Sequence, residues 1–176
     1  MCFVCHEPGS KASPSPFGEG RGEAKTEYGT LKNETIMPCI IQGRTHEDER
    51  GKLIFFNDFD MLPVKRFYVI EHPNTEIVRA WQGHKKEQKW FYVIAGGFKV
   101  VLVQPDDWKN PSLELEAEEY VLKAEDNRVL YIPGGRANGF KALSPGSKMM
   151  VFSSFTVEES SGDNYRYDKT LWYNWN

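Results

Sequence analysis

One short polar stretch carries the residue types that acid–base chemistry requires. It contains Arg79, Gln82, His84 and Gln88, and a glycine pair follows the next apolar run. Residues two apart on a strand point to the same face, so Gln82 and His84 share a face and Gln88 adds a polar group from the next strand. Imidazole titrates near neutral pH, which makes His84 the main candidate for general base or acid. A satisfied structural histidine is the alternative, and residues 85–87 are expected to form an exposed loop.

A second polar cluster lies in Ile132-Pro133-Gly134-Gly135-Arg136-Ala137-Asn138-Gly139-Phe140. A tight turn carries Arg136 and leads into a strand that begins with Asn138. A guanidinium is a fixed fork of donors for phosphate or carboxylate oxygens, so Arg79 and Arg136 are candidate anion-binding residues. A surface ion pair for Arg79 and a solvated turn for Arg136 are the alternatives.

The composition of the chain limits the number of domains, the kinds of partner and the cellular compartment that can be expected. The 176 residues, 40% of them hydrophobic, suffice for one domain with a core. Lys and Arg number 22 against 25 Asp and Glu, so no basic surplus favours nucleic acid as a partner. No apolar run is long enough to cross a membrane, no secretory signal opens the chain, and the three cysteines give no disulfide framework. A cytoplasmic protein is expected.

The sequence pattern predicts an all-β domain. From residue 38, short β-branched and aromatic runs alternate with Gly, Pro, Asn and Asp, which is typical of a sandwich or barrel. In residues 113–123, propensity favours a helix, but alternation of apolar and acidic residues favours a strand. We predict strands at residues 39–42, 52–56, 66–70, 76–81, 89–95, 98–103, 113–115, 119–122, 128–132, 138–142 and 148–155.

Residues 1–36 differ from the rest of the chain. Their Ser, Pro and Gly content shows no strand or helix period, which predicts a disordered extension before a domain at 37–176. Within it, Cys2-Phe3-Val4-Cys5-His6 matches the C-x-x-C-H pattern of c-type haem attachment. Attachment requires an exported chain, and no export signal precedes the motif. We therefore expect a solvated tail with free thiols.

The two polar clusters resemble the paired motifs of the cupin superfamily, which implies a double-stranded β-helix, or jelly-roll, barrel. The first cupin motif places H-x-H and then Glu before a glycine turn, and the second is P-x-G-x-x-H. Here these positions hold Gln82, His84, Gln88 and Asn138, so three of the four metal-ligand types are absent. We expect no bound catalytic metal, which disfavours a metal-dependent dioxygenase or isomerase.

Within that superfamily, the chain resembles the metal-free sugar-nucleotide branch, the dTDP-4-dehydrorhamnose 3,5-epimerases and the dTDP-4-keto-6-deoxyglucose 3,4-ketoisomerases. Arg79 with Gln82-Gly83-His84-Lys85-Lys86 is similar to their R-G-x-H-A-H-K-K, and Leu130-Tyr131-Ile132-Pro133 to L-x-I-P. The similarity covers about residues 48–155. It implies a nucleotide-sugar substrate with a keto group at C4, acid–base catalysis without a cofactor, and commonly a homodimer.

The resemblance also implies roles for particular residues. The epimerase base is replaced by Gln82, which accepts no proton at neutral pH, so 3,5-epimerisation is in doubt. His84 remains as the catalytic histidine. The epimerase tyrosine acid has no match at its usual place, so Tyr167, Tyr165 or Glu158 would have to substitute.

Further residues are expected to bind the substrate. Arg79, Gln82, Gln88, Arg136 and Asn138 are the polar candidates. The remaining candidate, with core packing as the stronger alternative, is an aromatic residue that could stack on a base or sugar, Trp90.

Two questions remain open at the level of sequence. A non-catalytic nucleotide-sugar or carbohydrate-binding cupin, which lost turnover with the base at position 82, is the alternative function. The C-terminal residues 163–176 are unusually aromatic and would form a sticky patch if exposed. We expect them to fold back over the domain or onto a second subunit.

Overall fold

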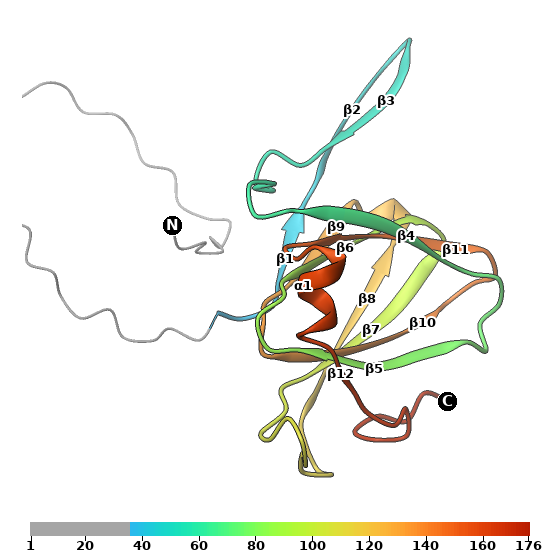
Figure 1. The fold of residues 1–176 in the computed structure, drawn as a ribbon. Coiled ribbons are helices and arrows are strands. Elements are labelled where there is room, and N and C mark those ends of the chain that lie inside the picture. Colours follow the sequence, from blue (N-terminus) through green and yellow to red (C-terminus); the bar gives the residue numbers. More distant parts are fainter. Residues whose placement is uncertain (1–35) are drawn as a thin grey trace, which may run out of the picture. The chain divides into compact units, whose positions relative to one another are not determined.

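Strands make up about half of the computed structural model, which describes residues 36–176 (Figure 1). The haem-attachment motif and the predicted disordered extension, except its last residue, lie outside the described residues. Two antiparallel five-stranded sheets form the body. The first has the order β1 (Cys39–Gln42), β9 (Arg128–Ile132), β6 (Lys89–Ala95), β11 (Ser147–Ser153), β4 (Arg66–His72). The second has the order β12 (Tyr165–Arg166), β5 (Val78–His84), β10 (Arg136–Ala142), β7 (Gly97–Val103), β8 (Ala117–Lys123).

The predicted jelly-roll, cupin-type fold is confirmed by these two sheets. A separate hairpin of β2 (Arg44–Asp48) and β3 (Gly51–Phe55) projects from the body (Figure 1). The helical parts are a short 3₁₀ turn, η1 (Ala124–Asp126), and one helix, α1 (Val157–Ser161). No helix among residues 36–176 is long and apolar enough to span a membrane.

The main core lies on the faces of the two sheets that turn toward each other. Alternation along β6 places Phe91 and Val93 in this core and Trp90 and Tyr92 on the opposite face of the sheet. Each fully buried apolar side chain contributes about 1.5–3 kcal/mol relative to exposure. The buried members of this core are Phe91, Val93, Phe98, Val100, Leu102, Leu122, Leu130, Ile132, Phe140, Ala142, Met149 and Val151.

The aromatic C-terminal segment folds back onto the outer face of the second sheet, as one of the two predicted arrangements requires. Trp81 is 1% exposed there and packs against Trp172 and Trp175, with ring centroids 5.4 and 5.5 Å away. A Cβ at Gly139 would lie 2.7 Å from atoms of both Ala80 and Trp175. A side chain at position 139 would therefore displace the segment.

Several predicted elements differ from the observed ones. No strand forms at residues 113–115, and the sheet begins only with β8 at Ala117. The strand predicted at 148–155 ends at Ser153 because Thr156 starts α1 with a capping box. In it, Thr156 Oγ1 accepts the backbone N–H of Glu159, and the Glu159 carboxylate accepts the N–H of Thr156. The strand at 44–48 was not predicted because its polar sequence shows no apolar alternation.

Candidate active site

A hollow of about 420 Å³ opens on the inner side of the two sheets. Its lining residues come from β4, β5, β6, β10 and β12, so strands distant in sequence build it together. A larger hollow of about 710 Å³ lies under the C-terminal segment and includes none of the predicted site residues. The smaller hollow, called the site pocket below, is lined by Tyr68, Ile70, Val78, Arg79, Ala80, Trp81, Gln82, Lys89, Phe91, Asn138, Phe140 and Arg166.

Three of the predicted substrate-binding residues meet in this pocket. Gln82 lies opposite Asn138 in the β5–β10 register, so their side chains share the inner face. Asn138 Nδ2 donates to the backbone oxygen of Gln82 at 2.9 Å, and Gln82 Nε2 donates to Asn164 Oδ1 at 3.3 Å. Arg79 joins them from the same strand as Gln82. The two polar clusters of the sequence therefore do converge at one place.

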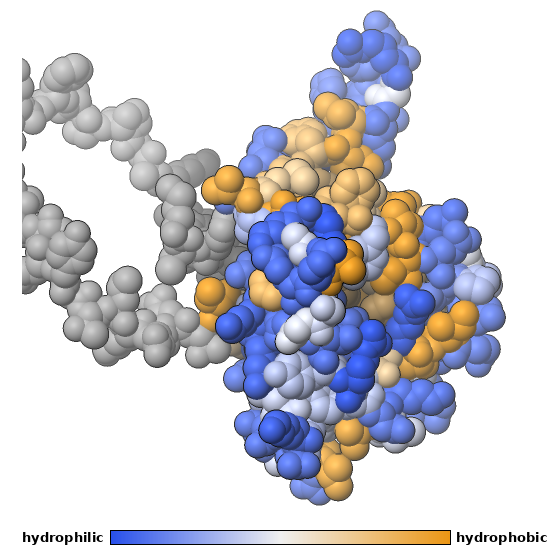
Figure 2. All heavy atoms as spheres, in the orientation of Figure 1, coloured by the Kyte–Doolittle hydropathy of each residue, from blue (hydrophilic) through white to orange (hydrophobic). Residues whose placement is uncertain are grey.

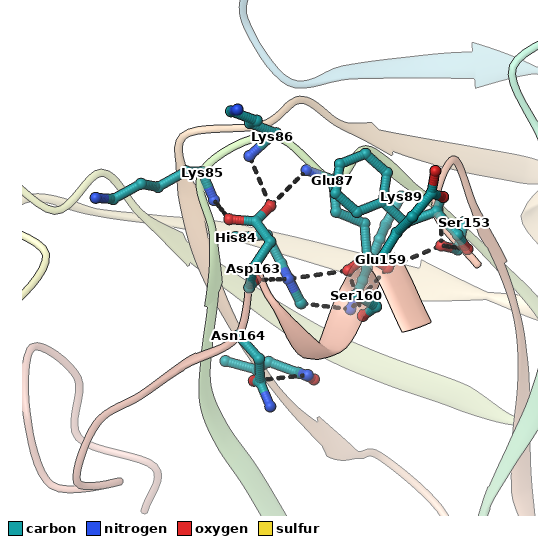
Figure 3. A network of polar contacts seen from close by, with 12 residues as sticks. His84, Lys85, Lys86, Glu87, Lys89, Ser153, Glu159, Ser160, Asp163 and Asn164 are labelled. Atoms are coloured by element: carbon teal, nitrogen blue, oxygen red, sulfur yellow. Dashed lines mark hydrogen bonds and ion pairs between the residues drawn. The ribbon is translucent and has the colours of Figure 1, made fainter. Parts of the chain in front are cut away.

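A buried charge network adjoins the pocket and consists of His84, Glu87 and Lys89 (Figure 3). His84 Nε2 lies 2.8 Å from Lys89 Nζ, and His84 Nδ1 lies 2.9 Å from Glu87 Oε2. All three residues are at most 3% exposed. Lys89 lines the site pocket, whereas His84 and Glu87 lie behind it and do not. The catalytic candidate His84 is therefore next to the site, but a lysine separates it from the cavity.

The partners of His84 determine which ring nitrogen carries a proton. Nδ1 faces two acceptors, the Glu87 carboxylate and the backbone oxygen of Asp163 at 2.6 Å, so Nδ1 is the donor. In a neutral imidazole, Nε2 is then the acceptor and receives a hydrogen bond from Lys89 Nζ. Loss of a proton from Lys89 Nζ leaves a neutral amine that faces the pocket.

The pKa values within the network follow from burial and from charge. Burial lowers the pKa of Lys89 to about 8, although the nearby Glu87 charge opposes the shift. Burial alone would raise the pKa of Glu87, but the hydrogen bond from His84, the Lys89 charge and the Ser160 hydroxyl together lower it to about 2. The carboxylate of Glu87 therefore stays ionised, and the amine of Lys89 loses its proton close to physiological pH.

The prediction of an exposed loop at residues 85–87 is wrong for Glu87. Lys85 and Lys86 are exposed, but Glu87 is 2% exposed and accepts hydrogen bonds from Ser153 at 2.8 Å and Ser160 at 2.7 Å. The carboxylate of the next partner, Asp163, accepts the backbone N–H groups of all three loop residues at 2.8–2.9 Å, as Figure 3 shows. The contacts of Ser160 and Asp163 come from α1 and the segment after it, more than 70 residues along the chain, and that of Ser153 comes from β11.

Two arginines give the pocket an uncompensated positive charge. Arg79 and Arg166 both line it, and neither forms an ion pair within residues 36–176. Arg166 Nε donates only to Asn164 Oδ1, at 3.2 Å. Both side chains are exposed, so they face solvent where an anionic ligand would enter. Unpaired guanidinium groups in a cavity favour phosphate oxygens.

Two predicted substrate-binding residues lie elsewhere. Arg136 is 5% exposed, and its Nη1 forms an ion pair with Glu118 Oε1 at 2.6 Å. The ion pair with this carboxylate on β8 holds the Arg136 side chain away from the site pocket. Trp90 packs on the outer face of the first sheet against Tyr131 and Phe59. Because alternate residues of β6 point to opposite faces, Lys89 and Phe91 point toward the pocket and Trp90 points away from it.

The remaining predicted residues are also outside the pocket. Tyr167 donates its hydroxyl to the backbone oxygen of Trp108 at 3.1 Å and packs on the outer face, because alternation turns only Arg166 of that segment inward. Glu158 is exposed on α1. Gln88 is half-buried, and its backbone N–H donates to Ser154 Oγ at 2.9 Å. The structure does not bring these side chains to the site pocket.

The donor set around the pocket contains few groups that bind metals. Among residues 36–176, no three His, Cys, Asp or Glu side chains gather closely enough to hold an ion. The cupin ligand positions are occupied by the amides of Gln82, Gln88 and Asn138 besides His84. Amide oxygens are weak ligands for divalent transition metals. The residues present therefore do not fit a transition-metal site.

Comparisons with known proteins agree with this architecture. Residues 37–173 match a protein-family model described as "FdtA: WxcM-like, C-terminal". A probable low-salt glycan biosynthesis epimerase of Haloferax volcanii is 25% identical over 133 residues, which cover 71% of this chain and 83% of that protein. The match to the family model covers and extends the stretch on which the sequence resemblance was based.

Two solved structures illustrate the shared fold. The TDP-quinovose 3,4-ketoisomerase of Campylobacter jejuni superposes with a TM-score of 0.58 at 24% identity, covering 78% of this chain and 95% of that one. The dTDP-4-dehydrorhamnose 3,5-epimerase of Bacillus anthracis, solved with TDP and pyrophosphate bound, gives a TM-score of 0.60 at 20% identity, covering 78% and 84%. At these identities the likeness establishes the fold.

Proposed function

The chain belongs to the WxcM-like, C-terminal family, and we propose that it isomerises a dTDP-linked 4-keto-6-deoxyhexose as an epimerase or 3,4-ketoisomerase of deoxysugar or polysaccharide biosynthesis. The named activities of the relatives support this class of reaction. A keto group at C4 acidifies the C–H bond at C3 and C5. A base and an acid are then sufficient, so the proposal includes neither a cofactor nor a metal.

The observation that carries the proposal is the combination of anion-binding and proton-carrying groups in one cavity. Arg79 and Arg166 supply two guanidinium groups without ion-pair partners, which suit the diphosphate of a nucleotide sugar. Lys89 supplies an amine that is connected to His84 at 2.8 Å. A phosphate-binding entrance beside a proton-transfer group is what such a substrate requires.

A second proton-bearing group lines the pocket from another strand. The phenol of Tyr68 on β4 has its pKa raised by burial and then by the Glu87 charge, so it stays protonated at neutral pH. A protonated phenol can donate to a keto oxygen as negative charge develops there. We propose that Tyr68 lies beside the sugar. The amides of Gln82 and Asn138 would then form hydrogen bonds with the hydroxyl groups of the sugar.

Product analysis tests the proposed reaction. The full chain is incubated with dTDP-4-keto-6-deoxyglucose, and carbon NMR follows the position of the carbonyl and the configuration at C3 and C5. Movement of the carbonyl to C3 identifies a ketoisomerase, and inversion at C3 or C5 identifies an epimerase. Unchanged substrate, in a sample that binds it, overturns the enzyme proposal in favour of a binding protein.

The amide at position 82 is the feature that favours the binding alternative, and one variant separates the two functions. Gln82→His restores an imidazole at the pocket, where the natural amide accepts no proton. If turnover appears only in this variant, the natural chain is a nucleotide-sugar-binding cupin. If the natural chain turns over, the proposed isomerase stands.

We also propose that the chain forms a homodimer through the outer face of its first sheet. Phe67 and Val69 on the edge strand β4 are 64% and 49% exposed, and Leu62 beside it is 91% exposed. Figure 2 shows apolar atoms gathered in this region and at the base of the projecting hairpin. A second copy would cover this face, and sedimentation equilibrium should give twice the chain mass. Phe67→Lys should then give a monomer, whereas a monomeric natural chain would contradict the proposal.

A further inference from the structure

We infer that Lys89 is the residue that exchanges a proton with the sugar carbon, and that His84 and Glu87 position it from behind. This inference rests on the proposed function and assigns its proton carrier. It replaces the expectation that His84 acts directly as the general base. Lys89 is thereby a catalytic residue, and His84 is a positioning residue.

The geometry places only one member of the network at the cavity. Lys89 lines the site pocket with Phe91 of the same strand, while His84 is enclosed by Lys89, Glu87 and the backbone of Asp163. A substrate in the pocket would meet the amine before it could reach the imidazole. Proton transfer requires contact within hydrogen-bond reach, so the amine is the group in position.

Lys89 is buried beside Glu87, but the hydrogen bonding of that carboxylate does not require it. It is the only charged residue of β6, in the sequence Lys-Trp-Phe-Tyr-Val-Ile-Ala, and its side chain is 4% exposed. Its distance to Glu87 Oε1 is 3.8 Å, too long for a hydrogen bond. Glu87 already has the His84 ring and two serine hydroxyls as partners. The carboxylate therefore does not need Lys89 to satisfy its hydrogen bonds.

The surroundings of Lys89 allow its amine to become neutral. Arg66 from β4 and Arg166 from β12 face it as cations, and Glu87 and Asp163 face it as anions, with the ring of His84 in contact. Burial is the largest influence and lowers the pKa of Lys89 to about 8. The hydrogen bond with His84 Nε2 at 2.8 Å holds Nζ in place, and the Glu87 carboxylate fixes the orientation of the His84 ring.

The resulting step can be written for carbonyl migration with every proton accounted for. The C3–H bond breaks, its proton goes to the neutral Nζ of Lys89, and its electron pair forms the C3=C4 double bond of an enediolate with the charge on O4. The proton on O3 moves to O4. Nζ then returns its proton to C4, which leaves the keto group at C3 and the amine neutral again. No oxidant, reductant or co-reactant is consumed.

Two substitutions at the same position test the assignment. Lys89→Arg keeps a positive charge beside Glu87 but does not release its proton, so the variant should fold and still lose the reaction. Lys89→Met removes the group altogether. We expect both to lower solvent-deuterium exchange into the substrate by about 10²–10⁴-fold, the usual contribution of a positioned acid–base group. Lys148→Met, on the neighbouring strand β11 with its ion pair to the exposed Glu71, is the matched control.

The pH dependence supplies a readout that a purely structural role would not change. Because the neutral amine is the active form, kcat/KM of the natural chain should rise with pH through an apparent pKa near 8. The Glu87 charge raises the pKa of Lys89, so Glu87→Gln should move this rise to lower pH. His84→Leu should also shift it, because Lys89 loses its hydrogen-bond acceptor. A rise that is unchanged in both variants overturns the positioning roles.

Other outcomes distinguish this inference from the proposed function. Exchange at the natural rate in Lys89→Arg overturns the role of Lys89 while leaving the isomerase proposal intact. No exchange in the natural chain overturns the proposed function itself. A substrate adduct on Lys89 after borohydride reduction would identify an imine intermediate and overturn simple proton transfer. Binding of dTDP alone should remain within about threefold in both variants, which shows that the entrance to the pocket is still folded.

Discussion

Two charge clusters with buried members lie at equivalent ends of paired strands, yet only one of them reaches a cavity. The Glu87 cluster (Glu87, His84, Lys89) follows β5, and the Arg136–Glu118 pair begins β10, with Arg136 directly opposite His84 in the register. The pair consists of one cation and one anion in contact at 2.6 Å, so its charge is balanced.

The Glu87 cluster differs from the pair in both charge and access. Lys89 and Arg66 accompany a single carboxylate within 4.0 Å, and Lys89 lines the pocket. Charged side chains at both strand ends would suggest a site at each. A buried charge that lacks a full counter-charge and lines a cavity therefore indicates a functional site. A buried charge that is paired with an opposite charge away from any cavity indicates a structural role.

The largest expected effect on stability comes from removing the anion of the Glu87 cluster. Glu87→Gln leaves Lys89 and Arg66 without a counter-charge, so the free energy of unfolding should fall by about 3–5 kcal/mol. Glu71→Gln breaks an exposed ion pair and should cost no more than about 0.5 kcal/mol. Urea unfolding measures both, and equal losses would contradict the comparison.

The same carboxylate should make stability depend on acid pH. The pKa of Glu87 is about 2 in the fold against 4.5 for a free group, so its contribution is present above pH 4.5 and is lost as the pH falls toward 2. The expected size is about 3 kcal/mol, at 1.36 kcal/mol per pKa unit. Urea unfolding at a series of pH values should show this loss in the natural chain and not in Glu87→Gln.

Breaking the second cluster should affect stability without affecting the reaction. Arg136→Met should lower the free energy of unfolding by about 2–3 kcal/mol, less than a fully buried pair because Glu118 retains access to water. Its kcat/KM, measured on the folded enzyme, should stay within about threefold. A loss of more than a hundredfold would return Arg136 to the substrate-binding role that the sequence suggested.

The unpaired arginines should contribute to binding, in contrast to the paired one. Arg79→Leu should weaken dTDP binding by about 10–100-fold, as expected for the loss of a charge-assisted phosphate contact of roughly 1.5–3 kcal/mol. The effect should diminish at high salt, and Arg136→Met should leave the dissociation constant unchanged. Calorimetric titration measures both. Equal dTDP affinities for Arg79→Leu and the natural chain would show that Arg79 does not bind the phosphate groups.

A buried neutral group provides the smallest test of the same reasoning. His72 is 1% exposed between Phe98 and Phe140, and within the described residues neither ring nitrogen has a hydrogen-bond partner. Burial lowers the pKa of His72 in the folded state. As the pH falls, the unfolded chain takes up a proton at this residue more readily than the folded chain, so the free energy of unfolding decreases. His72→Phe should raise the free energy of unfolding by about 1 kcal/mol at neutral pH. A decrease would show that the imidazole has a role in the fold.

Sequence patterns were sufficient for the fold and for part of the site. Short β-branched and aromatic runs bounded by Gly, Pro, Asn and Asp located nine of the strands closely. The cupin resemblance assigned Gln82 and Asn138 to one site, and both line the site pocket. A lone lysine at an inward position of an apolar strand was a further signal, and it could have identified Lys89.

The rest of the site depends on contacts between distant parts of the chain. Glu87 is buried because α1 and Asp163 fold over it, and no local pattern distinguishes it from the exposed Lys85 and Lys86. Arg166 was not predicted as a site residue, because residue type alone does not show which residue of a two-residue strand points inward. Arg136 pairs with Glu118, which comes from a strand that is not its neighbour in the sheet, so no local pattern in the sequence indicates this pairing.

Solvent-deuterium exchange tests the central claim most directly. The natural chain, Lys89→Arg and Arg136→Met are each incubated with dTDP-4-keto-6-deoxyglucose in heavy water, and proton NMR follows the loss of signal at C3 and C5. We predict deuterium incorporation with the natural chain and with Arg136→Met, and a rate reduced about 10²–10⁴-fold with Lys89→Arg. Equal exchange by Lys89→Arg and the natural chain would contradict the account, because the proton would then leave the sugar by another route.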